Sequence, residues 1–191
     1  MNKRKVAVLI SGNGSNLQAL IDACASKDYP AEIVGVISNK ADAFGLDRAK
    51  KANIPGFVID HKAHPSREDF DAALHQKLTE LGAEIVCLAG FMRLLTTEFV
   101  NRWSNRMINI HPSLLPDFKG GTAVSDALKA GAKVTGCTVH YVIPEMDSGE
   151  VILQRKVSIS DGETLDSLKH KIHEQEHLAY PEALKIACDR L

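Results

Sequence analysis

Short apolar runs alternate along this chain with segments in which apolar residues recur at helical spacing. The run from Lys5 to Ile10 is almost entirely apolar, as in a strand that is buried on both faces of a sheet. Further strands are predicted at 32–38, 56–59, 84–89 and 106–111, and helices at 17–24, 43–52, 66–78 and 97–103. This alternation predicts an α/β fold with a parallel, doubly wound sheet.

The pattern changes after a Pro- and Gly-rich loop at 112–122. A helix is predicted at 123–130, followed by strands at 135–142 and 151–159 that are joined closely enough to form an antiparallel hairpin. Thr164 is predicted to cap a closing helix, and Pro181 to begin a separate last segment. Because no repeat or linker interrupts the chain, we expect a single domain over residues 1–191.

Composition narrows the class of protein. The 191 residues carry a formal net charge of -1, and Lys and Arg are spread along the chain, which disfavours binding to nucleic acid. No apolar run approaches the length of a membrane span, and the run after the basic start is too short for a signal peptide. The four cysteines are far apart, as free thiols in a reducing compartment would be. We therefore expect a soluble cytoplasmic protein.

Asn109 and His111 stand two apart at the end of a predicted strand, so their side chains lie on the same face. Pro112 lacks a backbone donor and favours an end to the strand there. In sheets covered by helices, ligands bind at the carboxyl ends of the strands. Taken alone, a histidine at a strand end is more often an ordinary hydrogen-bonded or solvated side chain, so the pair needs support from elsewhere.

A glycine-rich turn, Gly12-Asn13-Gly14-Ser15-Asn16, joins the first strand to the first helix. Such a turn exposes backbone N–H groups at a helix N-terminus and favours a phosphate. It departs from the dinucleotide pattern, because Leu17 stands at the third glycine position and Asn39-Lys40 replaces the ribose-binding acid. The sequence thus favours a mononucleotide-type phosphate over a nicotinamide cofactor; a helix cap without a ligand is the alternative.

Asp147 lies in the predicted hairpin connection, where most acids simply form turns. If the hairpin lies beside residues 106–111, however, this carboxylate approaches His111 and favours its imidazolium form, which suits a general acid. His140 would then form a further polar wall, unless it is a strand histidine with a purely structural hydrogen bond.

The segment from His173 to His177 matches the zinc-protease pattern H-E-x-x-H. A catalytic zinc also needs a third protein ligand, and only Glu182 and Asp189 follow. We therefore predict no metal site. His173 and Glu176, three apart on one helical face, are predicted to reach a polar ligand instead.

Taken together, the motifs resemble the phosphoribosylglycinamide formyltransferase family. They occur in order over almost the whole chain: Ser11 to Leu17, Ser38 to Ala43, Leu88 to Leu95, Asn109 to Pro116, Gly136 to His140 and Asp147 to Gly149. The resemblance implies a three-layer, Rossmann-like formyltransferase fold with a mostly parallel sheet and an antiparallel C-terminal hairpin. It also implies transfer of a formyl group from 10-formyltetrahydrofolate, as co-substrate, to the amine of glycinamide ribonucleotide.

The resemblance also implies roles for individual residues. Asn109, His111 and Asp147 are expected to be catalytic. The ribonucleotide contacts are expected at Gly14, Ser15, Asn16, His173 and Glu176. The folate contacts are expected at Arg67, Met92, Arg93, Leu94, Leu95, Asn109, Ile143, Pro144, Glu145, Met146 and Asp147. No metal is expected, the partners are small molecules, and the chain is expected to be a monomer or homodimer.

Two positions depart from the family pattern. Val124 is aligned where many members carry histidine, and His173 where relatives carry glutamine. Formyltetrahydrofolate hydrolase, which resembles this chain in its Asn, His and Asp, normally has an extra N-terminal domain. Methionyl-tRNA formyltransferase adds a basic C-terminal domain. A non-catalytic nucleotide- or folate-binding module is the alternative of a different class.

Overall fold

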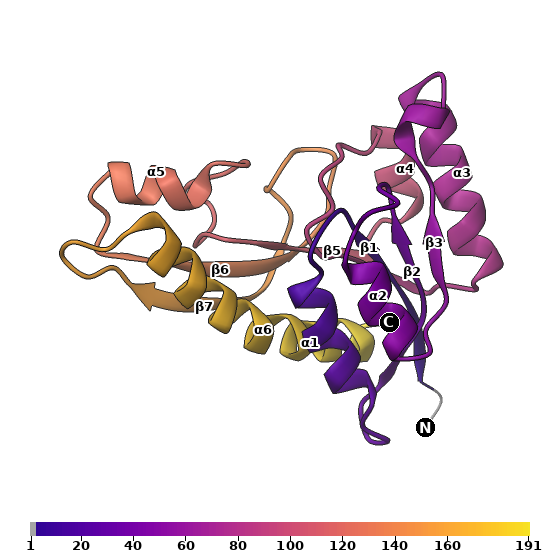
Figure 1. The fold of residues 1–191 in the computed structure, drawn as a ribbon, viewed down its shortest axis with the longest axis horizontal. Helices are drawn as coiled ribbons and strands as arrows, with labels where there is room; N and C mark the ends of the chain where they lie inside the picture. Colours follow the sequence, from indigo (N-terminus) through magenta and orange to yellow (C-terminus); the bar gives the residue numbers. More distant parts are fainter. Residues whose placement is uncertain (1–2) are drawn as a thin grey trace.

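The computed structural model describes residues 3–191 and arranges them as helices on both faces of one sheet (Figure 1). The strands are β1 (Arg4–Ile10), β2 (Ala31–Ser38), β3 (Gly56–Val58), β4 (Ile85–Leu88), β5 (Met107–His111), β6 (Val134–Tyr141) and β7 (Val151–Ser158). The α-helices are α1 (Ser15–Cys24), α2 (Gly45–Lys51), α3 (Arg67–Glu80), α4 (Thr97–Arg102), α5 (Ala123–Lys129) and α6 (Leu165–Asp189), and a 3-10 helix, η1, spans His61–Ala63.

The sheet has the order β3-β2-β1-β4-β5-β6-β7. Neighbouring strands from β3 to β5 are parallel, whereas β6 is antiparallel to both β5 and β7. The predicted parallel sheet with an antiparallel C-terminal hairpin is confirmed. The carboxyl ends of the parallel strands β1, β2, β4 and β5 therefore lie along the same side of the sheet, where ligand sites form in sheets of this kind.

Each face of the sheet has its own hydrophobic core. On one face, Val6, Val8 and Ile10 of β1 pack with residues of α1, α2, α5 and α6. On the other face, Ala7 and Leu9 pack with residues of α3 and α4. All five are fully buried, which explains why this strand is apolar at every position rather than at alternate ones.

The closing helix differs from its prediction. Thr164 caps it as expected, accepting a hydrogen bond from the Ser167 N–H, but Pro181 lies inside a continuous α6 and begins no separate segment. Proline removes one helical hydrogen bond. Burial of Tyr180 and Leu184 on either side offsets that loss, and the Pro181 carbonyl accepts a hydrogen bond from the Tyr29 hydroxyl at 2.6 Å.

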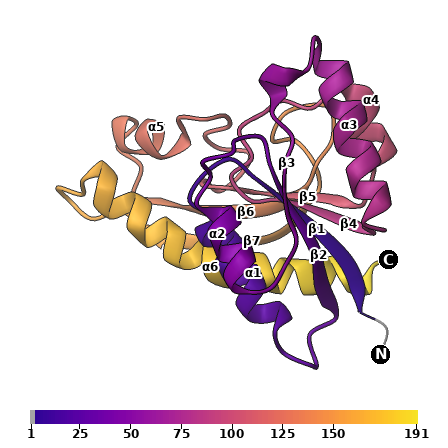
Figure 2. The ribbon, with the colours of Figure 1, turned by 45° about the vertical axis from the view of Figure 1, so that its right-hand side comes forward.

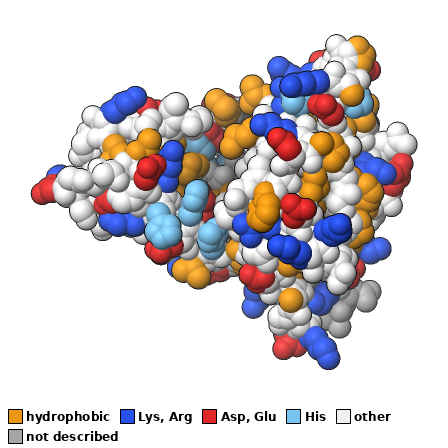
Figure 3. All heavy atoms as spheres, viewed as in Figure 1, with side chains coloured by type: hydrophobic (Ala, Val, Ile, Leu, Met, Phe, Trp, Pro, Cys, Tyr) orange, Lys and Arg blue, Asp and Glu red, His pale blue; other side chains and the backbone are white. Residues whose placement is uncertain are grey.

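The β6–β7 hairpin and α5 extend to one side of the parallel part of the sheet, and α6 runs back beneath both parts (Figures 1 and 2). On the face shown in Figure 3, histidine side chains gather in the hollow between these two parts, with apolar side chains along its upper edge. Within residues 3–191, no helix is both long and apolar enough to cross a membrane.

Candidate active site

Asn109 and His111 lie at the end of β5, where the sheet changes from parallel to antiparallel. On β6, Asn109 is opposite His140 and His111 is opposite Thr138. As predicted, the two side chains share one face of the strand, and both line a cavity of about 320 Å³. The carboxyl end of β5 lies between the parallel strands and the hairpin, so side chains from distant segments of the chain meet there.

Asp147 approaches His111 as the sequence predicted. Its Oδ2 atom lies 3.5 Å from the His111 Nδ1 atom, and the side chains are 9% and 7% exposed. The same Oδ2 accepts a hydrogen bond of 2.8 Å from the Gly120 N–H, which holds the carboxylate in place. The backbone at Asp147 has φ 51, a conformation that non-glycine residues adopt mainly in tight loops.

The opposite side of the imidazole is also fixed. His111 Nε2–H donates to the Phe118 carbonyl at 2.8 Å, because a carbonyl oxygen only accepts. With Nε2 occupied in this way, Nδ1 is the nitrogen that faces Asp147. This arrangement makes Nδ1 the position at which a proton can be held or released towards the cavity.

His140 orients Asn109 from the neighbouring strand. Burial lowers the pKa of His140, an effect that its hydrogen bond to Tyr141 and the nearby Asp147 partly oppose. Its Nδ1–H donates to the Tyr141 carbonyl at 2.9 Å, so in the neutral ring Nε2 accepts from Asn109 Nδ2 at 3.4 Å. One hydrogen of the Asn109 amide is thereby committed, and the other remains for a group in the cavity.

The walls of this cavity are mainly apolar and come from the segments that the resemblance implied. Nine of the expected folate contacts line it: Met92, Arg93, Leu94, Leu95, Asn109, Ile143, Pro144, Met146 and Asp147. Glu145 and Arg67 do not. Met92 and Leu94 are 73% and 62% exposed, unusual for large apolar side chains and typical of a ligand-binding surface.

The glycine-rich turn lines a second cavity, of about 250 Å³, together with His173. Gly14 has φ 74, and a Cβ atom built there would lie 2.8 Å from the Gly45 Cα, so only glycine fits. The cavity also includes Gly90 and Met92, which line the first cavity as well. The two cavities are therefore adjacent.

Glu176 lies behind the turn and is 4% exposed. Its Oε2 atom accepts a hydrogen bond of 3.0 Å from Asn16 Nδ2 and lies 3.9 Å from His173 Nε2. Burial raises the pKa of Glu176 to about 7, although the Asn16 hydrogen bond and His111 oppose the rise. His173 and Glu176 therefore lie on one face of α6, as their spacing indicated, and their contact with a polar ligand stays a prediction.

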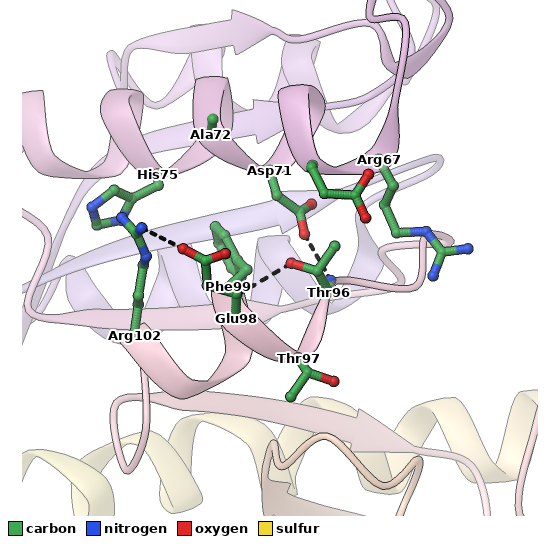
Figure 4. Close-up of a pocket in the computed structure, with 10 residues that line it drawn as sticks. Arg67, Asp71, Ala72, His75, Thr96, Thr97, Glu98, Phe99 and Arg102 are labelled. Carbon is green, nitrogen blue, oxygen red and sulfur yellow. Dashed lines mark hydrogen bonds and ion pairs between the residues drawn. The ribbon is translucent and has the colours of Figure 1, made fainter.

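Arg67 instead lines a third cavity, of about 520 Å³, between α3 and α4 (Figure 4). Arg67 and Arg102 lie at opposite ends of this cavity. In its middle part, the Thr96 N–H donates a hydrogen bond of 2.7 Å to Asp71 Oδ2. Thr96 directly follows the 90–95 segment that lines the first cavity. The sequence alone could not show that Arg67 lines the cavity between α3 and α4 and not the first cavity.

Val124 is buried on α5 within the core, and it lines neither the first nor the second cavity. His173 and His177 stack with ring centroids 6.3 Å apart. Within residues 3–191, no group of three or more His, Cys, Asp or Glu side chains is arranged to hold a metal ion.

Sequence reasoning missed the two backbone groups that fix the polar cluster, the Phe118 carbonyl and the Gly120 N–H. Backbone groups have no side-chain signature. The Gly120-Gly121 pair indicated a turn in this segment but not which atoms the turn would present to Asp147.

Comparison with known proteins agrees with this geometry. The formyl transferase family profile matches residues 4–184. The chain is 45% identical over 176 residues to "Phosphoribosylglycinamide formyltransferase" of Escherichia coli (strain K12), covering 92% of this chain and 83% of that protein.

It is also 54% identical over 186 residues to "Trifunctional purine biosynthetic protein adenosine-3" of Chironomus tentans, covering 96% of this chain but only 14% of that protein. A crystal structure of glycinamide ribonucleotide transformylase 1 from Symbiobacterium toebii superposes with a TM-score of 0.96 at 45% identity, covering 98% of this chain and 89% of that one. This chain belongs to the formyl transferase family.

Proposed function

We propose that this protein transfers a formyl group from 10-formyltetrahydrofolate to the amine of glycinamide ribonucleotide, releasing tetrahydrofolate and formylglycinamide ribonucleotide. One observation carries the proposal. Asn109, His111 and Asp147 line an apolar cavity that shares Gly90 and Met92 with the cavity at the glycine-rich turn. Donor and acceptor bound in these cavities would meet at the end of β5.

The second cavity suits the ribonucleotide. Backbone N–H groups of Gly14, Ser15 and Asn16 at the start of α1 favour a phosphate. Glu176 lies behind this cavity and not in its lining, and it is proposed to contact the ribose because its carboxyl group can accept a further hydrogen bond from a hydroxyl group. His173, which lines the same cavity, can donate a hydrogen bond to the phosphate or to the ribose.

The first cavity suits the folate. Exposed Met92, Leu94 and Met146 offer apolar contact to a flat heteroaromatic ring. Irregular backbone at 90–95 and 142–146 offers hydrogen-bonding groups for the ring edge. Glu145, in the second of these segments, is proposed to contact the donor although it does not line the cavity.

In the reaction, the substrate amine attacks the formyl carbon and forms a tetrahedral oxyanion. The free Asn109 N–H and the protonated His111 stabilise that charge, and a donor of this kind lowers the barrier by ~2.7–4 kcal/mol in other enzymes. Collapse breaks the bond to the folate nitrogen. Protonated His111, held by Asp147, donates its proton to that nitrogen, and the proton lost by the attacking amine then returns His111 to its protonated form. No covalent enzyme intermediate is formed.

The decisive experiment mixes the protein with 10-formyltetrahydrofolate, with and without glycinamide ribonucleotide, and follows tetrahydrofolate release. Release only with the ribonucleotide is expected. Release without it would instead indicate a hydrolase, and no release under either condition would indicate a binding module. His111→Ala should lower turnover by about 10²–10⁴-fold with little change in ligand affinity, whereas loss of ligand binding would contradict the assigned role.

The proposal extends to the setting of the enzyme. Its partners are small molecules, it works in the cytoplasm, and it is a monomer or homodimer. All four cysteines, Cys24, Cys87, Cys137 and Cys188, are free, which supports a reducing compartment. Sedimentation analysis at micromolar concentration distinguishes the monomer from the dimer.

A further inference from the structure

The 90–95 loop, which lines the first cavity, has little hydrogen-bonded support of its own. It lies between the end of β4 at Leu88 and the start of α4 at Thr97. Within the part of the chain that the structure describes, the one hydrogen bond found on its backbone N–H groups is that from Met92 to Ser11 Oγ, at 2.8 Å. The position of the loop therefore depends on the position of the Ser11 hydroxyl.

Ser11 belongs to a longer chain of hydrogen bonds across the strand ends. Its hydroxyl donates to Asn39 Oδ1 at 2.6 Å, and Asn39 Nδ2 lies 3.2 Å from His61 Nδ1. Ser11 follows β1, Asn39 follows β2, and His61 begins η1 beyond β3. The relay thus crosses three neighbouring strand ends before it reaches Met92.

With the Asn39 amide oriented as in the structure, the direction of every bond in this relay follows from its donors. The Met92 N–H can only donate, so the Ser11 oxygen accepts from it and the Ser11 hydrogen goes to the Asn39 carbonyl oxygen. The amide nitrogen of Asn39 then donates to Nδ1 of His61. Ser11 and Asn39 are 5% and 2% exposed, so an unpaired group here would be costly and the relay has one favourable arrangement.

A second contact ties the same loop to the same 3-10 helix. The Phe91 ring stacks on Phe70, with centroids 6.4 Å apart and planes at 12°. The His61 ring meets the same Phe70 edge-on, with centroids 6.4 Å apart. Polar and aromatic contacts therefore converge on residues 91 and 92 from His61.

We propose that Asn39 is a positioning residue for the folate site. Through Ser11 it sets the place of Met92, and so the shape of the first cavity, called the donor cavity from here on because it is proposed to bind the formyl donor. This inference rests on the proposed function, because it takes the 90–95 loop as the binding surface for the folate. Asn39 itself lines neither the donor cavity nor the cavity at the glycine-rich turn. Any effect of Asn39 on the donor must therefore be transmitted through its hydrogen bonds.

The test compares Asn39→Ala and His61→Ala with Tyr29→Phe, which removes a hydrogen bond far along the chain from the loop. Asn39→Ala should raise the KM for 10-formyltetrahydrofolate about tenfold and His61→Ala about threefold, the range that a lost hydrogen bond explains. The kcat value should stay within about twofold. Because Ser11 and Met92 also line the cavity at the glycine-rich turn, the KM for glycinamide ribonucleotide should rise as well in Asn39→Ala, but by no more than about threefold. Tyr29→Phe should lower the melting temperature and leave the KM values unchanged.

Amide hydrogen exchange supplies a readout that needs no ligand. Exchange of the Met92 amide, which donates to Ser11, should become faster in Asn39→Ala and remain unchanged in Tyr29→Phe. The inference is overturned if exchange of the Met92 amide is unaffected by Asn39→Ala, or if the KM for glycinamide ribonucleotide rises as much as the KM for 10-formyltetrahydrofolate. Calorimetry with tetrahydrofolate separates the two proposals. If the unmodified protein does not bind it, the proposed function fails and the inference with it; if binding is unchanged in Asn39→Ala, only the inference fails.

Discussion

Asp147 Oδ2 lies 3.5 Å from His111 Nδ1, although the two residues come from the hairpin connection and from the end of β5. The carboxylate faces the imidazole and fixes its orientation. Asp147→Asn keeps the size of the side chain and an oxygen for the Gly120 N–H but removes the charge. We expect kcat to fall by about 10²–10⁴-fold in steady-state assays, with substrate affinities nearly unchanged.

Asp161→Asn is the matched control for that change. Asp161 pairs with Lys133 at 2.8 Å, but its side chain is 94% exposed and lies outside both cavities. It should leave kcat unaltered, because an exposed ion pair contributes little. Equal losses in the two variants would show that the charge of Asp147 has no specific role.

Gly14→Ala should destabilise the turn at the start of α1. At φ 74 an alanine incurs about 1–2 kcal/mol of backbone strain. The contact of the new Cβ with the Gly45 Cα, at 2.8 Å, adds about 1–3 kcal/mol. Urea unfolding measures the sum. Gly12→Ala is the control, since no atom lies within 4 Å of a Cβ there, and a similar loss in that variant would refute the explanation.

Glu176→Gln should change how stability depends on pH. The folded protein holds the Glu176 proton up to a pKa of about 7, whereas the ordinary value is 4.5, so between these values the folded state binds more protons than the unfolded state. Stability therefore falls as pH rises through this window, and the cost is fully present above pH 7. Above pH 7 the Gln variant should be more stable by up to about 3 kcal/mol, with the difference vanishing near pH 4.5.

Denaturant unfolding at pH 5, 6, 7 and 8 is the measurement for Glu176→Gln. Glu174→Gln, on the same helix, is the control because Glu174 is exposed and pairs with His170 on the surface. Its stability profile should run parallel to that of the unmodified protein. If the Glu176→Gln profile were parallel as well, the buried carboxyl group would not be the titrating group.

Most helices and strands could be predicted because each leaves a local pattern in the sequence. Full burial of β1 leaves a continuous apolar run, and a helical spacing of apolar residues remains visible in α3 and α6. Pro181 was misplaced because the tertiary packing of Tyr180 and Leu184, which keeps α6 continuous, leaves no local signal in the sequence.

The site was predictable where side chains carry the chemistry and not where the backbone does. Asn109 and His111 could be paired from their spacing, and the approach of Asp147 followed once the hairpin was placed beside β5. The hydrogen bonds of the Phe118 carbonyl with His111 and of the Gly120 N–H with Asp147, and the relay through Asn39, depend on how separate segments are aligned in space. Strand order is a property of the whole sheet, so no single motif specifies these contacts.

Arg67 lies in the cavity between α3 and α4 rather than in the donor cavity, so its predicted contact with the folate can be tested separately (Figure 4). A folate that reaches past Thr96 would bring its glutamate carboxylates to this guanidinium group. Arg67→Ala should then raise the dissociation constant of folate by about three- to tenfold, as for a charged hydrogen bond at an exposed position. It should leave the dissociation constant of pteroate, which lacks the glutamate, unchanged.

Arg102→Ala is the control, because Arg102 lies at the other end of the cavity and is already paired with Glu98. It should change neither dissociation constant. Titration calorimetry with the two ligands separates the outcomes: equal weakening of both would place Arg67 beside the ring, and no weakening of either would remove it from the site.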